Sequence, residues 1–306
     1  MSIAIIVPDR DISTFVTELR SFCNEQVFVN PSSMDLDKVE TAILWNHPIG
    51  TISSFPNLKL ICSFGAGVDH ITSDPEYNPA IPLTRIVDEE LTESMTRYVV
   101  AAVSMFQYGF HFSGDKELGQ QYIRKPIHPP ELTVGILGLG ALGEASAKCI
   151  SELKYKVLGI SRRKKDLDGV HTFALSEMDT FLSQTNILIC MLPLTNETMD
   201  MVDYQMLSSL RNPSYFINVG RGNQVKEEDL LKGIKDEFLL GACLDVVKNE
   251  PIKVDHPFIK ESRIILTPHI ASITNQRNAA RIIGENINRF RNGEKLRFQV
   301  DPNTGY

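Results

Sequence analysis

Short apolar runs alternate with amphipathic stretches along nearly the whole length of the chain. In the first hundred residues the strand candidates are residues 3–7, 42–45 and 58–64, and the helix candidate is residues 12–22. Six further strand candidates are residues 132–137, 157–160, 187–192, 215–219, 239–246 and 264–267. Apolar strands separated by helices are typical of parallel sheets with crossover helices. The sequence therefore predicts an α/β fold with a parallel sheet in each half.

The length of 306 residues is more than one hydrophobic core usually holds, which indicates two domains. A helix-like stretch at 92–108 leads into a polar segment at 111–130, which is rich in breakers and is a candidate domain boundary. Ser176, with Asp179 three residues later, predicts the capped start of a helix. The last helical pattern, at 274–290, is expected to cross back to the first domain. The predicted domains are residues 1–97 together with 275–306, and residues 98–274.

Charge and composition exclude several classes of protein. With 31 basic and 38 acidic residues, the net charge of -7 gives no electrostatic footprint for nucleic acid or an anionic membrane. We expect no signal peptide and no membrane span, because no run of about 18 apolar residues is present. Five scattered cysteines without a Cys-x-x-Cys pair predict reduced thiols, no metal site and a cytoplasmic location. The cysteines are Cys23, Cys62, Cys149, Cys190 and Cys243.

A glycine motif follows the strand candidate at 132–137 and opens a helix candidate at 141–153. Its glycines, Gly138, Gly140 and Gly143, have the spacing of a dinucleotide-binding turn. The first two would let the backbone approach a pyrophosphate, the third would let helix and strand pack closely, and helix N–H groups would hold the phosphates. A purely structural turn can carry the same spacing, but the strand before it and the helix after it favour a cofactor site.

The segment that discriminates between nicotinamide cofactors is expected about 20 residues after this motif. An NAD-specific site carries an acidic residue there, whereas this chain has Ser161, Arg162 and Arg163, followed by two lysines. A hydroxyl and guanidinium groups can bind a 2′-phosphate, which a carboxylate would repel. The sequence therefore favours NADP(H) and leaves NAD(H) open as a second cofactor; the alternative is a solvated basic loop.

Three polar residues, Arg221, Glu250 and His269, each come shortly after an apolar strand in the second half. Because ligands bind outside the carboxyl ends of parallel strands, these side chains could converge on one crevice. An arginine can grip carboxylate and carbonyl oxygens in a planar fork, and a histidine can donate a proton to a developing alkoxide. A glutamate beside the histidine would favour the imidazolium. Singly, each could be an ordinary surface, turn or buried residue, but together they point to reduction of a 2-keto acid.

Five motifs in this order resemble the D-isomer-specific 2-hydroxyacid dehydrogenase family, and within it the glyoxylate/hydroxypyruvate reductase A type. The motifs are residues 64–69 (FGAGVD), 138–143 (GLGALG), 219–222 (VGRG), 249–251 (NEP) and 267–271 (TPHIA). The resemblance covers nearly the whole chain. It implies a Rossmann-like cofactor domain, a flavodoxin-like substrate domain and a homodimer joined largely through the cofactor domain.

The resemblance also implies roles for individual residues in hydride transfer from the nicotinamide to C2 of the substrate. Arg221 would bind the substrate, His269 would be the general acid, and Glu250 would be the partner of His269. The expected cofactor contacts are Gly138, Leu139, Gly140, Ala141, Leu142, Gly143, Ser161, Arg162, Arg163, Leu192, Pro193, Val219, Gly220, Arg221, Asp245, His269 and Ala271.

For the substrate, the resemblance implies that the backbone N–H groups of Ala66, Gly67 and Val68 receive the carboxylate. Trp45 would close the pocket over a small apolar or hydroxymethyl group; the alternative is an ordinary core residue. Residues 111–130 could be an arm that embraces a second subunit, or a loop. Apart from Arg85, the first domain shows no basic cluster for a substrate phosphate, which argues against a phosphoglycerate dehydrogenase.

The function predicted from these observations is NADPH-dependent reduction of small 2-keto acids, such as glyoxylate and hydroxypyruvate, to 2-hydroxy acids. Two alternatives stay open at this point. One is a reductase of another 2-keto acid, such as a bulkier one, ketopantoate or phosphohydroxypyruvate. The other is a non-enzymatic dinucleotide sensor, which would need the glycine motif but not Arg221, Glu250 and His269 together.

Overall fold

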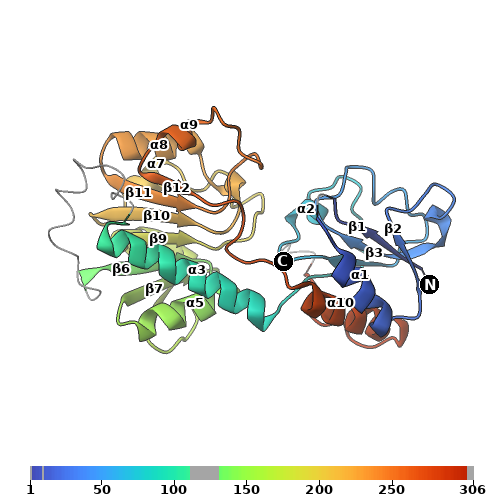
Figure 1. Ribbon diagram of the computed structural model, residues 1–306. Helices are drawn as coiled ribbons and strands as arrows, with labels where there is room; N and C mark the ends of the chain where they lie inside the picture. Colours follow the sequence, from blue (N-terminus) through green and yellow to red (C-terminus); the bar gives the residue numbers. More distant parts are fainter. Residues whose placement is uncertain (1, 9, 111–130, 302–306) are drawn as a thin grey trace. The chain divides into compact units, whose positions relative to one another are not determined.

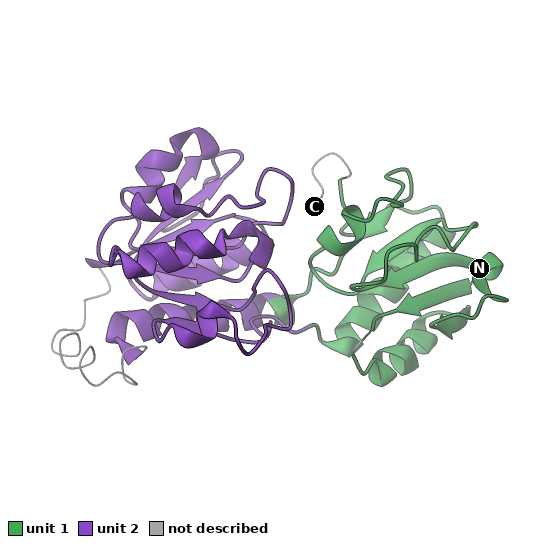
Figure 2. Ribbon diagram, turned by 90° about the horizontal axis from the view of Figure 1, so that it is seen from above, with its two compact units in different colours: residues 1–91, 274–306 green, residues 92–273 purple. Residues whose placement is uncertain are grey.

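The computed structural model describes residues 2–8, 10–110 and 131–301, so the predicted arm at 111–130 lies outside the described residues. The chain divides into two compact units (Figure 2). Unit 1 consists of residues 1–91 and 274–306, and unit 2 of residues 92–273. Unit 1 is therefore built from two separate stretches of chain, with all of unit 2 inserted between them.

Unit 1 contains a five-stranded sheet in the order β2-β1-β3-β4-β5, in which all neighbours are parallel. Its strands are β1 (Ser2–Ile6), β2 (Gln26–Val29), β3 (Val39–Leu44), β4 (Leu60–Ser63) and β5 (Leu83–Thr84). Its helical segments are α1 (Ser13–Phe22), η1 (Leu36–Lys38), α2 (Asp69–Thr72) and α10 (Gln276–Arg291). The strand order is that of flavodoxin-like folds.

Helix α10 returns to unit 1 and packs beside α1 (Figure 1). It begins where the side chain of Asn275 accepts hydrogen bonds from the N–H groups of Arg277 and Asn278, and so satisfies two of the donors that a helix start leaves open. Gly284 lets the two helices approach closely, because a Cβ there would lie 2.5 Å from the Cβ of Phe22. The predicted C-terminal helix is thus present as part of unit 1.

Unit 2 contains a seven-stranded, fully parallel sheet in the order β12-β11-β10-β9-β6-β7-β8. Its strands are β6 (Thr133–Leu137), β7 (Lys156–Ser161), β8 (Val170–Ala174), β9 (Ile187–Cys190), β10 (Ser214–Asn218), β11 (Leu239–Leu244) and β12 (Ile264–Leu266). Counted within the unit, this is the dinucleotide-binding order with one strand added beyond the sixth. The order reverses between β6 and β9, which is where such folds bind their ligands.

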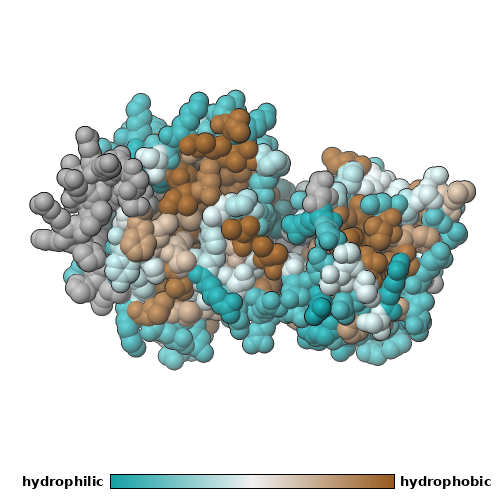
Figure 3. Space-filling view, in the orientation of Figure 1, coloured by the Kyte–Doolittle hydropathy of each residue, from teal (hydrophilic) through white to brown (hydrophobic). Residues whose placement is uncertain are grey.

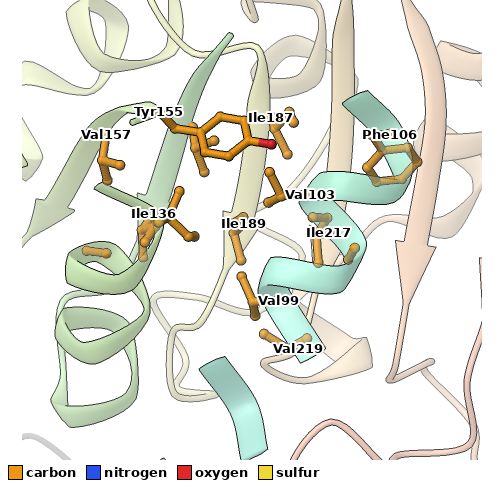
Figure 4. Packing of buried hydrophobic residues seen from close by; sticks show 14 of the residues in the cluster. Val99, Val103, Phe106, Ile136, Tyr155, Val157, Ile187, Ile189, Ile217 and Val219 are labelled. Atoms are coloured by element: carbon orange, nitrogen blue, oxygen red, sulfur yellow. The ribbon is translucent and has the colours of Figure 1, made fainter. Parts of the chain in front are cut away.

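Helices cover both faces of this sheet. The helical segments of unit 2 are α3 (Glu89–Tyr108, which starts in unit 1), α5 (Ala141–Glu152), η4 (Leu175–Glu177), α6 (Met178–Leu182), α7 (Tyr204–Ser208), η5 (Gly222–Gln224), α8 (Glu227–Lys235) and α9 (Pro257–Lys260). On one face, Val99, Val103 and Phe106 of α3 pack against Ile189 and Ile217 of the strands (Figure 4). Each such buried side chain contributes about 1.5–3 kcal/mol of hydrophobic stabilisation, so α3 is fixed firmly to the sheet.

The predicted fold class, α/β with two parallel sheets, is confirmed, but the sequence missed three strands. These are β2, β5 and β8, and each is an edge strand of its sheet. β2 and β5 are short, and β8 mixes polar and apolar residues. The predicted cap at Ser176 is wrong. The 3-10 turn η4 begins after Ala174, whose N–H donates to the carboxylate of Glu177 at 2.8 Å, and no side chain caps α6. Ser176 lies inside the turn η4, which Glu177 closes by accepting from the N–H of Ala174, so Ser176 is not at the start of a helix.

Hydrophilic side chains cover much of the margin of each unit on the face in Figure 3, with hydrophobic patches between them. Several large apolar side chains are exposed singly, among them Met34, Ile49 and Val254. Among residues 2–8, 10–110 and 131–301, no helix combines the length and the apolar character needed to cross a bilayer.

Candidate active site

The glycine motif forms the turn between β6 and α5, at the point where the order of the sheet reverses. Gly138 has a φ of 109°, a conformation that favours glycine. A Cβ on Gly143 would lie 2.0 Å from the carbonyl oxygen of Gly138, so only glycine lets the helix start this close to the strand. A Cβ on Gly140 would meet no described atom within 4 Å, and no side chain caps α5. The chain itself therefore explains two glycines, and the third leaves backbone N–H groups accessible to a ligand.

The basic loop after β7 lies next to this turn. The ammonium group of Lys165 donates to the carbonyl oxygen of Leu139 at 2.7 Å and pairs with Glu144, so it ties the basic loop to the glycine motif. Arg162 pairs with Glu197 at 3.2 Å, with both side chains exposed. Such exposed pairs contribute at most about 1 kcal/mol, so a phosphate can compete for Arg162.

Ser161 does not point freely toward a ligand: its hydroxyl donates to the carbonyl oxygen of Arg163 at 2.7 Å. To donate to a phosphate, the hydroxyl of Ser161 would have to break this bond. The side chain of Arg163 is already exposed to solvent, where a phosphate could reach it. The sequence missed Lys165 as a positioning residue. Its only signal was membership of the basic run, which does not say which side chain bonds the glycine turn.

Gln224, which is buried, connects two of the predicted cofactor segments. Its amide nitrogen donates to the carbonyl oxygens of Leu192 and Pro193 at 3.0 and 3.1 Å, and its amide oxygen accepts from the N–H of Arg221 at 2.8 Å. The loop after β9 and the turn after β10 are therefore held together. Nothing in the sequence distinguished Gln224 from a surface amide, because Leu192 and Pro193, the two carbonyls that accept from it, lie about thirty residues away in the chain.

The arginine turn also packs against the loop after β11. A Cβ on Gly222 would lie 1.9 Å from the carbonyl carbon of Val247 and 2.4 Å from the nitrogen of Lys248. Only glycine permits this contact, which holds Arg221 beside the segment that leads to Glu250. The guanidinium of Arg221 donates to the carbonyl oxygen of Gly220 at 2.8 Å.

Glu250 and His269 form a hydrogen-bonded pair, with Nδ1 of His269 lying 2.8 Å from Oε2 of Glu250. Because an ionised carboxylate only accepts, Nδ1 carries the proton of this bond and Nε2 is the nitrogen open to a substrate. Burial by itself would raise the pKa of the Glu250 carboxyl. The bond and charge of His269, the N–H of Val247 and the charge of Arg221 together outweigh burial and lower that pKa. Glu250 is therefore ionised at neutral pH beside His269 and within the field of Arg221.

The backbone of His269 has a φ of 53°, in the left-handed region that residues other than glycine rarely adopt. Such a conformation costs about 1–3 kcal/mol and persists only where the surroundings hold it. Here the N–H of His269 donates to the carbonyl oxygens of Asp245 and Thr267 at 2.9 and 3.0 Å. The carboxylate of Asp245, itself buried, accepts from the N–H groups of Ile270 and Ala271. Asp245 and Ala271, both predicted cofactor contacts, thus shape the histidine turn.

Two predicted substrate-binding segments lie in unit 1, after β4 and β3. In the loop after β4, the hydroxyl of Ser63 donates to the carbonyl oxygen of Gly67 at 2.7 Å, and Arg85 donates to that of Ala66 at 3.4 Å. Within the described chain, the N–H groups of residues 66–68 have no protein acceptor. The carbonyls are thus fixed while the three N–H groups can take an anion.

The side chain of Trp45 is buried, with 8% of the residue exposed. A Cβ on Gly65 would lie 2.2 Å from the indole, so the ring packs directly on the loop that carries residues 66–68. The guanidinium of Arg10 lies 4.8 Å from the centre of the indole, and the ring of His70 is also 4.8 Å away. Trp45 is therefore both a packed residue and a neighbour of the predicted carboxylate loop.

Comparison with known proteins places these features in a family. Residues 113–271 match the family described as "D-isomer specific 2-hydroxyacid dehydrogenase, NAD binding domain". A D-isomer specific 2-hydroxyacid dehydrogenase from Xanthobacter autotrophicus Py2, solved with NADPH and MES, is 32% identical, with a TM-score of 0.90 over 100% of this chain and 99% of that one.

Two further solved structures cover the whole chain. An NADPH-dependent glyoxylate/hydroxypyruvate reductase from Sinorhizobium meliloti, solved with NADP and sulfate, is 28% identical with a TM-score of 0.89 over 100% of both chains. A probable 2-hydroxyacid dehydrogenase from Rhizobium etli CFN 42, solved with NADP, HEPES and L(+)-tartaric acid, is 32% identical with a TM-score of 0.88 over 100% of this chain and 99% of that one.

Proposed function

Because the chain belongs to the D-isomer specific 2-hydroxyacid dehydrogenases, oxidoreductases that act on a CHOH group, we propose that it reduces glyoxylate, hydroxypyruvate or similar small 2-keto acids with NADPH. The observation that carries the proposal is the Glu250–His269 pair, 2.8 Å apart, within the field of Arg221. These three groups follow the adjacent strands β10, β11 and β12. They supply an anion-binding guanidinium and an acid held in one orientation, which reduction of a 2-keto acid requires.

The residues present fit NADP(H). The uncapped start of α5 and the open side of Gly140 suit a pyrophosphate, and the basic loop with Arg162 and Arg163 suits a 2′-phosphate. The three structural neighbours described above were solved with NADPH or NADP, in keeping with this assignment. When bound, the cofactor supplies the hydride. The other predicted contacts, including Leu192, Pro193 and Val219, are proposed on the strength of their place after β9 and β10.

In the proposed mechanism, Arg221 binds the substrate and polarises its carbonyl group. Nε2 of His269 donates a proton to the carbonyl oxygen as negative charge develops there. Glu250 keeps the imidazole in the orientation set by its bond at Nδ1 and stabilises the imidazolium before the proton leaves. A general acid must carry the proton that it donates, so this mechanism requires the imidazolium form of His269.

In unit 1 we assign the substrate carboxylate to the N–H groups of Ala66, Gly67 and Val68, and a limit on substrate size to Trp45. The support is the three N–H groups without a protein acceptor in the described chain and the indole packed on the same loop. We further propose that the chain acts as a homodimer, which sedimentation would test, and that it works in the cytoplasm, in keeping with five free thiols.

The deciding experiment measures NADPH oxidation with a panel of 2-keto acids: glyoxylate, hydroxypyruvate, pyruvate, a bulkier branched 2-keto acid, ketopantoate and phosphohydroxypyruvate. We expect the highest kcat/KM with glyoxylate or hydroxypyruvate, and a lower KM for NADPH than for NADH. A preference for a bulkier or phosphorylated acid would replace the substrate assignment. Inactivity on every 2-keto acid, with NADPH binding retained, would contradict the proposed function.

A further inference from the structure

The turn that carries His269 is held by a carboxylate with three donors. Oδ1 of Asp245 accepts from the hydroxyl of Thr267 at 2.6 Å and from the N–H of Ile270 at 2.8 Å. Oδ2 accepts from the N–H of Ala271 at 2.8 Å. Asp245 is 3% exposed, so these bonds form away from water and are correspondingly strong. The chain on both sides of His269 is thereby fixed to one side chain.

The network continues from Asp245 into helix α3. The hydroxyl of Tyr98 lies 2.6 Å from Oγ1 of Thr267 and 3.3 Å from Sγ of Cys243. The hydroxyl of Thr267 donates to Oδ1 of Asp245, so its single proton is committed to that bond. Tyr98 must then donate to Thr267, and the thiol of Cys243 donates to Tyr98. The result is a one-way chain of donors from Cys243 through Tyr98 and Thr267 to Asp245.

Tyr98 and Cys243, the two donors farthest from Asp245, keep their protons at neutral pH. Burial raises the pKa of the Tyr98 hydroxyl far above its ordinary value, and burial likewise raises the pKa of the Cys243 thiol. Tyr98 is partly buried against the same cluster as its neighbour Val99. Figure 4 shows Val99 packed with Val103 and Phe106 of α3 against the sheet. The donor end of the chain is thus anchored in the core, whereas the acceptor end lies at the histidine turn.

We propose that Tyr98 is a positioning residue for His269. Through Thr267 and Asp245, it holds the turn in which His269 keeps its left-handed backbone and its bond to Glu250. The proposal rests on the proposed function only in treating His269 as the proton donor. Because Tyr98 touches neither Glu250 nor His269 directly, its effect must travel through the turn.

The test compares Tyr98→Phe with Tyr155→Phe, a matched control. Tyr155 is buried in the core cluster against which Tyr98 packs and donates its hydroxyl proton to Gln107, and within the described residues it has no bond to the histidine turn. We expect Tyr98→Phe to lower kcat by about 10-fold with the KM for the 2-keto acid nearly unchanged, because the acid and not the binding site is displaced. Tyr155→Phe should leave kcat unchanged. Equal effects of the two variants on kcat would overturn the proposal.

Thr267 supplies a second pair of variants. Thr267→Val removes the hydroxyl at nearly constant volume and should lower kcat at least as far as Tyr98→Phe, whereas Thr267→Ser keeps the hydroxyl and should restore most of it. Failure of serine to restore more activity than valine would count against the donor chain.

Hydrogen exchange gives a readout that does not depend on activity. The amides of Ile270 and Ala271, both bonded to Asp245, should exchange about 10-fold faster in Tyr98→Phe and at the wild-type rate in Tyr155→Phe. If the wild-type protein proves inactive on all 2-keto acids, the proposed function fails while this measurement still decides whether Tyr98 holds the turn. Unchanged exchange in Tyr98→Phe would show that it does not.

Discussion

At the scale of single residues, one hydrogen bond and one strained backbone conformation fix the position of the proposed proton donor, His269. His269 has Nδ1 on Glu250 and a left-handed φ, so its position depends on its surroundings and not on local preference. His269→Ala should lower kcat by about 100-fold or more, which is the usual share of general acid catalysis. His256→Ala is the matched control, because His256 lies 3.3 Å from Glu227 in another histidine–glutamate pair of unit 2. Near-normal turnover in His269→Ala would remove His269 from the mechanism.

Glu250 determines how the imidazolium responds to pH. Its carboxyl has a lowered pKa, so it stays charged until the pH falls well into the acid range, and its negative charge favours a protonated neighbour. Glu250→Gln keeps the shape but removes the charge. The decline of kcat/KM with rising pH should therefore begin at lower pH in the variant than in the wild type. Rate–pH profiles measured side by side would decide, and superimposable profiles would contradict the assigned role.

At the scale of elements, close backbone contacts bring the strand-end loops together. Gly222→Ala would place a Cβ against the backbone of Val247, which cannot move aside as a flexible side chain can. The Arg221 turn should shift from the Glu250 loop, and kcat/KM should fall by about 10-fold or more. Gly233→Ala, in helix α8, is the control, because the nearest contact of its Cβ would be the ring of Phe238, at 2.8 Å, and not a backbone atom of the site loops. Steady-state kinetics should show a loss in the first variant only.

The loop after β7 should decide cofactor preference by charge. Replacing Arg162 and Arg163 together by alanine should raise the KM for NADPH by about 10-fold, since each charge-assisted bond to a phosphate is worth roughly 1.5–3 kcal/mol at best and exposure reduces that. The KM for NADH, which lacks the 2′-phosphate, should stay constant and serves as the internal control. A parallel rise in both constants would mean that the loop does not read the phosphate.

At the scale of the whole molecule, stability should form a plateau in pH with losses at both ends. Several carboxyls, among them Glu250, Glu261 and Glu40, have a pKa below the ordinary value of 4.5, so their stabilisation is present above that value and is lost as the pH falls below it. Burial raises the pKa of Cys62 and Cys190 from 9.0 to about 12, so their stabilisation is present below pH 9.0 and is lost between there and about 12.

Calorimetric melting across a pH series tests this expectation. The Tm should be nearly constant between about pH 6 and 8 and should fall on either side, first where the carboxylates gain protons and then where the thiols lose them. A Tm that rises as the pH drops below 4.5 would contradict the carboxyl shifts.

Much of the fold was predictable because the signals are local. Apolar runs such as those around β6 and β9 are buried and are easily recognised as strands, and the spaced glycines at 138, 140 and 143 mark a turn that requires glycine at 138 and 143. The family likeness rests on the same local motifs. The edge strand β8 was missed because an edge strand is only partly buried and its pattern VHTFA is mixed.

The amino-acid sequence alone determined the parallel α/β organisation, the strand ends that carry polar residues, and the kinds of groups available for chemistry. Only the tertiary structure decided which of these groups meet. Gln224, Lys165 and Tyr98 bond to segments that are tens to more than a hundred residues away in the chain, so no spacing within the sequence identifies them. Such contacts depend on the order of strands in the sheet, because that order places residues side by side that are far apart in the sequence.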